Sequence, residues 1–109
     1  MQAPLIGITT FRSRKDGQAD QHAISEAYVR AVIRAGGVPV LIPVTLQEHE
    51  AEVLSDRLDG LLLSGGGDML PEKYGGTMIG KVNYMDGDRD DLEIELVKQA
   101  VKKGLPLLG

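Results

Sequence analysis

Apolar and polar positions follow two patterns along this chain. The first consists of short runs in which nearly every residue is apolar, at residues 4–9, 38–42, 61–63 and 105–109. Unbroken apolar runs of this length are typical of parallel strands that are buried on both faces. The second pattern is helical spacing, which occurs in the segments between these runs. Strand and helix therefore alternate, which predicts an α/β fold: a doubly wound, mostly parallel sheet with helices on both faces.

Three helices are expected, at residues 22–35, 47–58 and 88–103. In the first, apolar side chains recur as one helical stripe: Ile24, Ala27, Tyr28, Ala31, Val32 and Ala35. Gly36 and Gly37 follow it, as a C-terminal cap requires. The other two helices carry acidic residues in their first turns and basic residues in their last, the order that the helix dipole favours. The apolar positions of the third predict its inner face: Leu92, Leu96, Val97, Ala100 and Val101.

Two segments are too polar, or too rich in glycine and proline, for a regular element. Residues 10–21 are predicted as a polar loop that either lies on the surface or borders a site, and a surface loop is the simpler interpretation. Residues 69–87 predict a longer loop, which is usually functional or disordered, and we favour a functional loop. The aspartates within 86–91 lack the glycine and glutamate spacing of an EF-hand loop, so charge at a helix start explains them better than calcium binding.

Composition narrows the classes of function. The chain has 109 residues, a formal net charge of -4 and an isoelectric point near 5.1. This length suits one small domain, and the charge argues against a nucleic-acid binder, which needs a clustered basic face. No apolar stretch reaches the ~20 residues of a membrane span, and the N-terminus has no secretory leader pattern, so a cytoplasmic location is expected. Because the sequence has no cysteine, it offers neither thiolate ligands nor a thiol nucleophile. Separately, we expect no metal and no cofactor.

The two histidines of the chain do not form a recognisable site. His22 stands at the start of the first expected helix and could be a ligand or a base. A lone histidine beside a loop is more often a surface or capping residue, which is the interpretation we favour. Neither His22 nor His49 is predicted to be catalytic.

The most distinctive stretch follows the third strand and reads Ser64, Gly65, Gly66, Gly67, Asp68. Glycines directly after a buried strand allow backbone N–H groups to approach a ligand closely. One use of such a turn is to cradle a phosphate, but a phosphate site expects a helix straight after the glycines. Pro71 and the long loop argue against that use.

Three segments of the chain are together similar to one known family. The first matches the pattern Ser-Gly-Gly-x-Asp-x-x-Pro-x-x-Tyr-Gly at residues 64–75, and the second matches Tyr-x-x-Ala-x-x-x-Ala-Gly-Gly-x-Pro-x-x-x-Pro at residues 28–43. The third contains Arg89, Asp90 and Glu93, followed by the apolar run at 104–109. Over almost its whole length the chain resembles the class I glutamine amidotransferase-like hydrolases of the peptidase C26 group, typified by hydrolysis of γ-glutamyl-γ-aminobutyrate.

The resemblance implies flavodoxin-like layering and a cysteine nucleophile in a Gly-x-Cys-x-Gly turn, with a histidine and an acid later in the chain. Gly109 matches the first glycine of that turn. The cysteine would then lie two residues beyond Gly109. Residues 1–109 are accordingly expected to be the N-terminal part of a single domain, inactive by themselves and completed by the remainder of that domain.

The implied reaction is cleavage of γ-glutamyl amides of small amines through a thioester intermediate. By resemblance, the Gly66 N–H is one oxyanion donor, while Gly65 and Gly67 shape the turn. The residues predicted to fix the loop or to border the substrate pocket are Asp68, Pro71 and Tyr74. A small γ-glutamyl amide is the expected partner, and a homodimer is left open. Two alternatives remain: a glutaminase portion that supplies ammonia to a synthetase, and a non-catalytic α/β ligand-binding domain.

Overall fold

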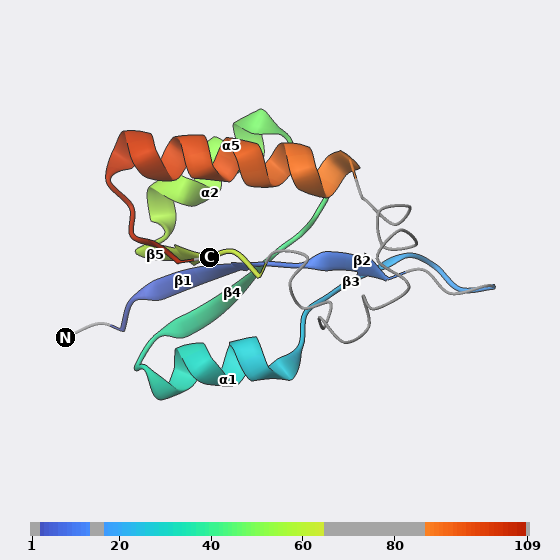
Figure 1. Cartoon of the computed structure of the whole chain (residues 1–109), viewed down its shortest axis with the longest axis horizontal. Coiled ribbons are helices and arrows are strands. Elements are labelled where there is room, and N and C mark those ends of the chain that lie inside the picture. Colours follow the sequence, from blue (N-terminus) through green and yellow to red (C-terminus); the bar gives the residue numbers. More distant parts are fainter. Residues whose placement is uncertain (1–2, 14–16, 65–86, 109) are drawn as a thin grey trace, which may run out of the picture.

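The computed structural model describes residues 3–13, 17–64 and 87–108. Four strands of these residues form one sheet (Figure 1). They are β1 (Leu5–Thr9), β4 (Val38–Ile42), β5 (Gly60–Leu62) and β6 (Leu107–Leu108), in the order β4-β1-β5-β6. Every neighbouring pair in this sheet is parallel. The predicted mostly parallel sheet is confirmed.

β1 lies inside the sheet although it comes first in the sequence. The chain passes from β1 to β4 on one side, and then crosses to β5 on the other side of β1. A sheet whose winding reverses in this way has a switch point, here between β1 and β5. Ligands of open α/β sheets bind outside the carboxyl ends of the strands at such a point. The carboxyl ends of β1 and β5 are therefore where a site is expected.

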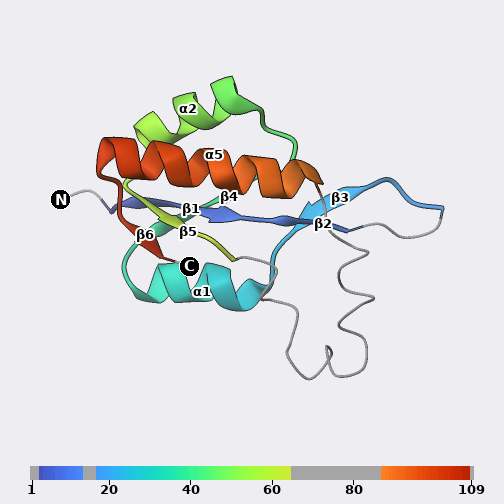
Figure 2. The same ribbon diagram turned by 45° about the horizontal axis from the view of Figure 1, so that its top comes forward.

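Helices cover both faces of the sheet (Figures 1 and 2). α1 (Glu26–Arg34) lies on one face, whereas α2 (Glu48–Arg57) and α5 (Gly87–Lys103) lie together on the other. This placement confirms the predicted doubly wound α/β class. In the part of the chain that the structure describes, no helix is long and apolar enough to cross a membrane.

Local hydrogen bonds and one glycine set the ends of the helices. The Ser25 hydroxyl accepts a hydrogen bond from the backbone N of Ala27 at 3.3 Å and caps the start of α1. At the start of α2, Glu50 Oε1 accepts from the backbone N of Gln47 at 2.8 Å. Gly36 follows α1 with a φ of 93°, in the left-handed region that glycine adopts without a Cβ penalty. The predicted glycine stop of this helix is confirmed.

The hydrophobic core lies between the sheet and the layer formed by α2 and α5. Its buried members come from β4, β5, the two helices and the residue after α2: Ile42, Ala51, Leu58, Leu61, Leu92, Leu96 and Ala100. Gly7 in β1 allows this layer to approach, because a Cβ at that position would stand 2.6 Å from Leu58 Cδ1 and 2.8 Å from Ile42 Cδ1. In α1, by contrast, Val32 is the buried residue.

α1 differs from its predicted form. It begins at Glu26 and not at residue 22, because the preceding residues are extended and Ser25 caps the helix. The predicted apolar stripe is buried at Val32 and half-buried at Tyr28. Three alanines of that stripe are exposed: Ala27, Ala31 and Ala35.

The predicted inner face of α5 is confirmed at its centre and wrong at one edge. Leu92, Leu96 and Ala100 are buried, but Val101 is 75% exposed. Gln99 is buried in its place, and its Nε2 donates to Glu95 Oε2 at 2.9 Å. The buried residues thus lie on one face of α5, and Val101 lies outside that face.

The prediction of a loop at residues 10–21 is wrong at both ends of that range. Two short strands, β2 (Phe11–Ser13) and β3 (Gln21–Ala23), pair antiparallel there. The hairpin extends from the carboxyl end of β1 (Figure 1). The loop predicted at residues 69–87 lies outside the described residues, apart from Gly87, which begins α5.

Candidate functional site

Two hydroxyl side chains meet at the carboxyl ends of β1 and β5. Thr9 ends β1 and is 1% exposed, and Ser64 follows β5 and is 5% exposed. The backbone N of Ser64 donates to Thr9 Oγ1 at 2.9 Å, and Ser64 Oγ donates to the carbonyl oxygen of Thr9 at 2.9 Å. The two hydroxyl oxygens are 3.2 Å apart. Ser64, which directly precedes the glycine run, is therefore fixed to β1 at the switch point.

The donors and acceptors of this contact can be assigned from the chemistry of a hydroxyl group. A serine hydroxyl has one proton and two lone pairs. Ser64 gives its proton to the Thr9 carbonyl, so Thr9 Oγ1 is the donor between the two hydroxyls. The other lone pair of Ser64 Oγ accepts from Arg89 Nη2 at 3.2 Å. All three hydrogen-bonding positions of the Ser64 hydroxyl are thus used.

Arg89 brings a positive charge from the first turns of α5 to this edge of the sheet. Its Nε lies 3.4 Å from Glu93 Oε2, at the i, i+4 spacing that places both side chains on one face of the helix. The two side chains are 12% and 22% exposed. A charge that is largely withdrawn from water is stable only when it is paired and hydrogen-bonded. Glu93 and Ser64 together provide that pairing.

The hairpin is attached to the same edge of the sheet near its base. Thr10 Oγ1, between β1 and β2, donates to the carbonyl oxygen of Ile42 at 2.7 Å. In β3, His22 Nδ1 accepts from the backbone N of Val44 at 3.3 Å, which places the ring proton of a neutral His22 on Nε2. His22 therefore joins the hairpin to Val44, which follows β4. The favoured interpretation of His22 as a surface or capping residue is confirmed for the surface, because His22 is exposed, and wrong for the cap, because Ser25 caps α1.

Arg12 attaches the hairpin to α5. Its Nη2 donates to Asp88 Oδ2 at 3.0 Å, and the Arg12 side chain is 10% exposed. Asp88 and Arg89 are neighbours in sequence, so the start of α5 is held both to the hairpin and to the end of β5. The contacts around the switch point thus join three parts of the chain that are distant in sequence.

β6 ends beside Ser64. Leu62 is paired with Leu108 in the parallel register, and the backbone N of Leu63 donates to the carbonyl oxygen of Leu108 at 2.7 Å. Ser64 and Gly109 directly follow Leu63 and Leu108 in the sequence. Since parallel strands end at the same edge of a sheet, the described ends of β5 and β6 lie next to each other. The resemblance relates the residues that follow these two ends in the sequence to the oxyanion loop and the nucleophile turn.

The residues predicted to form the site itself lie outside the described residues: Gly65, Gly66, Gly67, Asp68, Pro71, Tyr74 and Gly109. Their roles stay predictions. What the structure brings together is Thr9, Ser64 and Arg89, of which Ser64 directly precedes the glycine run in the sequence. His49 is exposed on α2 and belongs to no part of this group.

Comparison with known proteins assigns the chain to a family. The family model of peptidase C26 matches residues 4–109. This chain belongs to the peptidase C26 family. Its parallel sheet with helices on both faces is the partial α/β domain expected of a class I glutamine amidotransferase-like fold.

Relatives of this peptidase C26 chain match it along its whole length. The gamma-glutamyl-gamma-aminobutyrate hydrolase of Escherichia coli O157:H7 is 35% identical over 111 residues, which cover 100% of this chain and 42% of that hydrolase. The gamma-glutamyl-gamma-aminobutyrate hydrolase PuuD of Escherichia coli (strain K12) is 34% identical, with the same shares covered. A glutamine amidotransferase-like protein of Rickettsia prowazekii (strain Madrid E) is 32% identical over 114 residues, 99% of this chain and 40% of that protein. The chain thus spans about 42% of the length of the hydrolases it matches.

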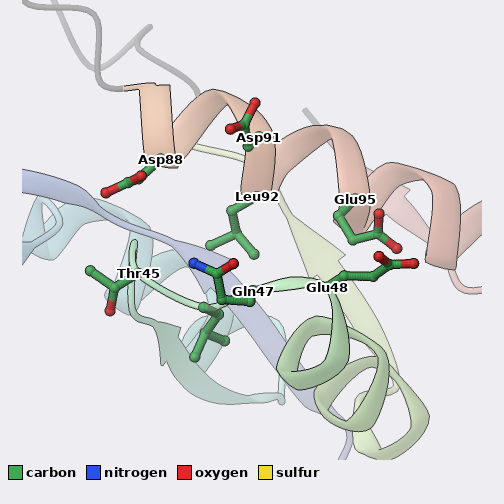
Figure 3. A pocket seen from close by; sticks show the side chains of 8 residues that line it. Thr45, Gln47, Glu48, Asp88, Asp91, Leu92 and Glu95 are labelled. Atoms are coloured by element: carbon green, nitrogen blue, oxygen red, sulfur yellow. The ribbon is translucent and has the colours of Figure 1, made fainter.

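A hollow of about 170 Å³ opens elsewhere in this peptidase C26 chain, between the β4–α2 connection and the start of α5 (Figure 3). Leu92 and Gln47 face each other across it. Four carboxylates line it: Glu48, Asp88, Asp91 and Glu95. Their charge disfavours an anionic γ-glutamyl group. Across the described ranges, no group of three or more His, Cys, Asp or Glu residues could hold a metal ion. The hollow is therefore not assigned as the substrate site.

The group of Thr9, Ser64 and Arg89 was not predicted as a unit. Thr9 and Thr10 place two hydroxyls at the end of an apolar strand, which is a signal for a polar sheet edge. Arg89 belongs to a segment that matches the peptidase C26 pattern, but that match gave it no role. Its contact with Ser64 joins residues 25 positions apart, across the long predicted loop, and no local sequence pattern records such a contact.

Proposed function

We propose that the complete protein containing this chain is a cysteine-dependent hydrolase of γ-glutamyl amides of small amines, of the γ-glutamyl-γ-aminobutyrate type. Membership of the peptidase C26 family supports a hydrolase. Two relatives named for hydrolysis of γ-glutamyl-γ-aminobutyrate support the class of substrate.

The parallel pairing of β5 with β6 is the observation that carries the proposal. Oxyanion donors must lie about 3 Å from the oxygen that becomes charged when the nucleophile attacks. In support of this arrangement, the hydrogen bond from Leu63 N to Leu108 O holds the ends of the two preceding strands side by side. In the proposed enzyme, the Gly66 N–H in one segment and the N–H after the cysteine in the other bind the same oxyanion. Gly65 and Gly67 shape the first of these segments.

The proposed reaction has two halves. The cysteine thiolate attacks the γ-carbonyl carbon, the C–N bond breaks, and the amine leaves with a proton from the general acid. Water then attacks the thioester, which releases glutamate and restores the thiolate. The histidine and acid expected beyond Gly109 move and orient this proton. Asp68, Pro71 and Tyr74 fix the loop or border the pocket of the γ-glutamyl group.

The coding sequence beyond Gly109 provides the first test. The proposal expects a Gly-x-Cys-x-Gly turn in which Gly109 is the first glycine. A coding sequence with no cysteine at the second position beyond Gly109 would remove the nucleophile and overturn the cysteine-hydrolase assignment.

Substrate preference provides the second test, and it separates the two enzymatic candidates. The Rickettsia prowazekii relative favours a glutaminase portion as the second candidate. We expect the complete protein to hydrolyse γ-glutamyl-γ-aminobutyrate with a higher kcat/KM than glutamine, and to lose this activity after treatment with iodoacetamide. A preference for glutamine would support the glutaminase, and activity that survives alkylation would contradict a cysteine nucleophile.

Residues 1–109 by themselves are expected to be inactive, because they contain no cysteine. The measurement is amine release by this chain and by the complete protein at equal concentrations. Release above the blank by residues 1–109 would contradict the proposed nucleophile. A cytoplasmic location and a homodimer stay predictions, to be checked by cell fractionation and by light scattering.

A further inference from the structure

Arg30 and Arg89 each form an i, i+4 ion pair with a glutamate, but in different surroundings. The Arg30 and Glu26 side chains on α1 are 62% and 75% exposed. Those of Arg89 and Glu93 on α5 are 12% and 22% exposed, and Arg89 also donates to the buried Ser64. Exposed pairs contribute little to stability, whereas a charge withdrawn from water needs its partners. Support for the helix alone does not explain why Arg89 reaches the end of β5.

The shape of the guanidinium group suits two of the acceptors that Arg89 contacts. Nη2 donates to Ser64 Oγ at 3.2 Å, while Nε donates to Glu93 Oε2 at 3.4 Å. The N–H groups of arginine lie in one rigid plane, a geometry that a lysine ammonium group cannot reproduce. Glu93 therefore sets the plane of the guanidinium group, which in turn holds the Ser64 hydroxyl. Thr9 holds the same hydroxyl through its carbonyl and side-chain oxygens.

We propose that Arg89 is a positioning residue for the reaction, acting through Ser64 on the glycine run that follows it. This inference rests on the proposed function. A run of glycines has little conformational preference of its own, so the direction of its N–H groups depends on how the flanking residue is held. Arg89 touches no reacting atom in this role. Instead it holds Ser64, the residue that directly precedes the glycine run with the proposed Gly66 donor.

Arg89→Gln in the complete protein is expected to lower kcat for γ-glutamyl-γ-aminobutyrate about tenfold, with KM changed less than about twofold. A displaced oxyanion donor weakens binding of the transition state more than binding of the substrate. Arg30→Gln is the matched control, because it removes the same side chain from an exposed i, i+4 pair on α1. It should leave both constants unchanged. A kcat per folded molecule that is also unchanged in Arg89→Gln would overturn the inference.

A double-mutant cycle tests whether Arg89 acts through Ser64. Ser64→Ala removes the acceptor, so adding Arg89→Gln to it should lower kcat by less than about twofold more. If the kcat of the double variant is lowered by the full product of the two single losses, Arg89 does not act through Ser64 and the inference is wrong. A KM that rises tenfold with kcat unchanged would instead identify Arg89 as a substrate-binding residue, and would also overturn the inference.

Two further variants keep the inference testable if Arg89→Gln does not fold. Arg89→Lys keeps the charge but not the planar fork, and Glu93→Gln leaves Arg89 in place while weakening the pair that orients it. Both should lower kcat per folded molecule less than Arg89→Gln, at an unchanged KM and with a cooperative unfolding transition. If both have wild-type kcat, the inference is wrong. The proposed function is tested separately, on the wild-type protein. If the wild type hydrolyses neither γ-glutamyl-γ-aminobutyrate nor glutamine, the proposed function is wrong, whatever the variants do.

Discussion

Among the described residues, the two helix layers cover opposite faces of one sheet and differ in how many of their apolar side chains are buried. The layer of α2 and α5 contributes most members of the contiguous core cluster, including the fully buried Leu96. In α1, Val32 is buried, while the neighbouring Ile33 is 56% exposed. α1 nevertheless has the more regular apolar stripe in its sequence. A stripe predicts a helix and its inner face, but the depth of burial depends on what else packs there.

Contacts between helices explain part of this difference. α2 and α5 lie against each other as well as against the sheet, and Lys103 of α5 joins them. Its Nζ donates to the carbonyl oxygen of Glu52 at 2.9 Å and forms an ion pair with Asp56. α1 lies alone on its face among the described residues. A helix that packs against a second helix buries side chains on that side, in addition to those that it buries against the sheet.

Truncation of the core on each face should give the largest difference. Leu96→Ala is expected to lower the free energy of unfolding by about 2–5 kcal/mol, because Leu96 is 1% exposed and a cavity would remain. Val32→Ala on the other face should cost about 1–2 kcal/mol, since fewer buried methyl groups are lost. Urea unfolding of the complete protein measures both. Ile94→Ala, on the exposed side of α5, is the control and should stay within about 0.5 kcal/mol of the wild type.

Addition of a methyl group tests how tightly each layer is packed. Gly7→Ala should destabilise by about 1–3 kcal/mol, because its Cβ would overlap the buried Leu58 and Ile42. Gly37→Ala points toward the α1 side, where the nearest atoms, in Ile6 and Val32, are 3.0 and 3.1 Å away. A shift of a few tenths of an ångström removes this overlap, so the cost should be below about 1 kcal/mol. Equal losses in the two variants would show that both layers are equally rigid.

Loss of the cap of α1 should have a smaller effect. Ser25→Ala removes the hydroxyl that accepts from Ala27 N, and the expected cost is about 1 kcal/mol. The same loss should raise hydrogen exchange in the first turn of α1 and leave α5 unchanged. Ser25→Thr keeps an acceptor and is the matched control. An α1 whose exchange is unchanged in Ser25→Ala would mean that packing, and not the cap, sets where it begins.

The smallest effects are expected from the surface charges of the two layers. Lys103→Met should cost about 0.5–1 kcal/mol, because Lys103 is 22% exposed and joins α2 to α5. Arg30→Met should cost less than about 0.5 kcal/mol, because its pair with Glu26 lies within one exposed helix. Unfolding midpoints at low and high salt measure both differences. A larger loss from Arg30→Met would contradict the view that α1 contributes less.

Much of the fold could be predicted from the sequence because its strands are short apolar runs and its helix starts and stops are marked. The strand at Val38–Ile42 agrees with the prediction at both ends, since two glycines precede it and Pro43 follows it. The β2–β3 hairpin could not be predicted in the same way. Each of its strands has three residues, too few for an alternation of apolar and polar positions to be recognised. Its position depends on contacts with Ile42, Val44 and Asp88, which are distant in sequence.

The candidate site could be predicted only where the chemistry is local. A glycine run after an apolar strand identifies a place where a backbone N–H can face a ligand, and this signal is complete within residues 61–68. The residues that hold Ser64, directly before that run, are not close to it in the sequence. Thr9 lies 55 positions from Ser64, and Arg89 lies 25 positions away on the other side. The strand order brings these residues together, and the strand order follows from the whole topology.

The position of β1 inside the sheet affects how the chain folds while it is being synthesised. β1 leaves the ribosome before β4 and β5, its partners on its two edges. Until they emerge, the backbone of this apolar strand is unpaired on each side, and such an edge is a template for association between chains. Closing long loops before any strand pairing is gained also slows folding. The segment around Ile6 and Ile8 is therefore open to association with other chains until both of its partner strands have emerged.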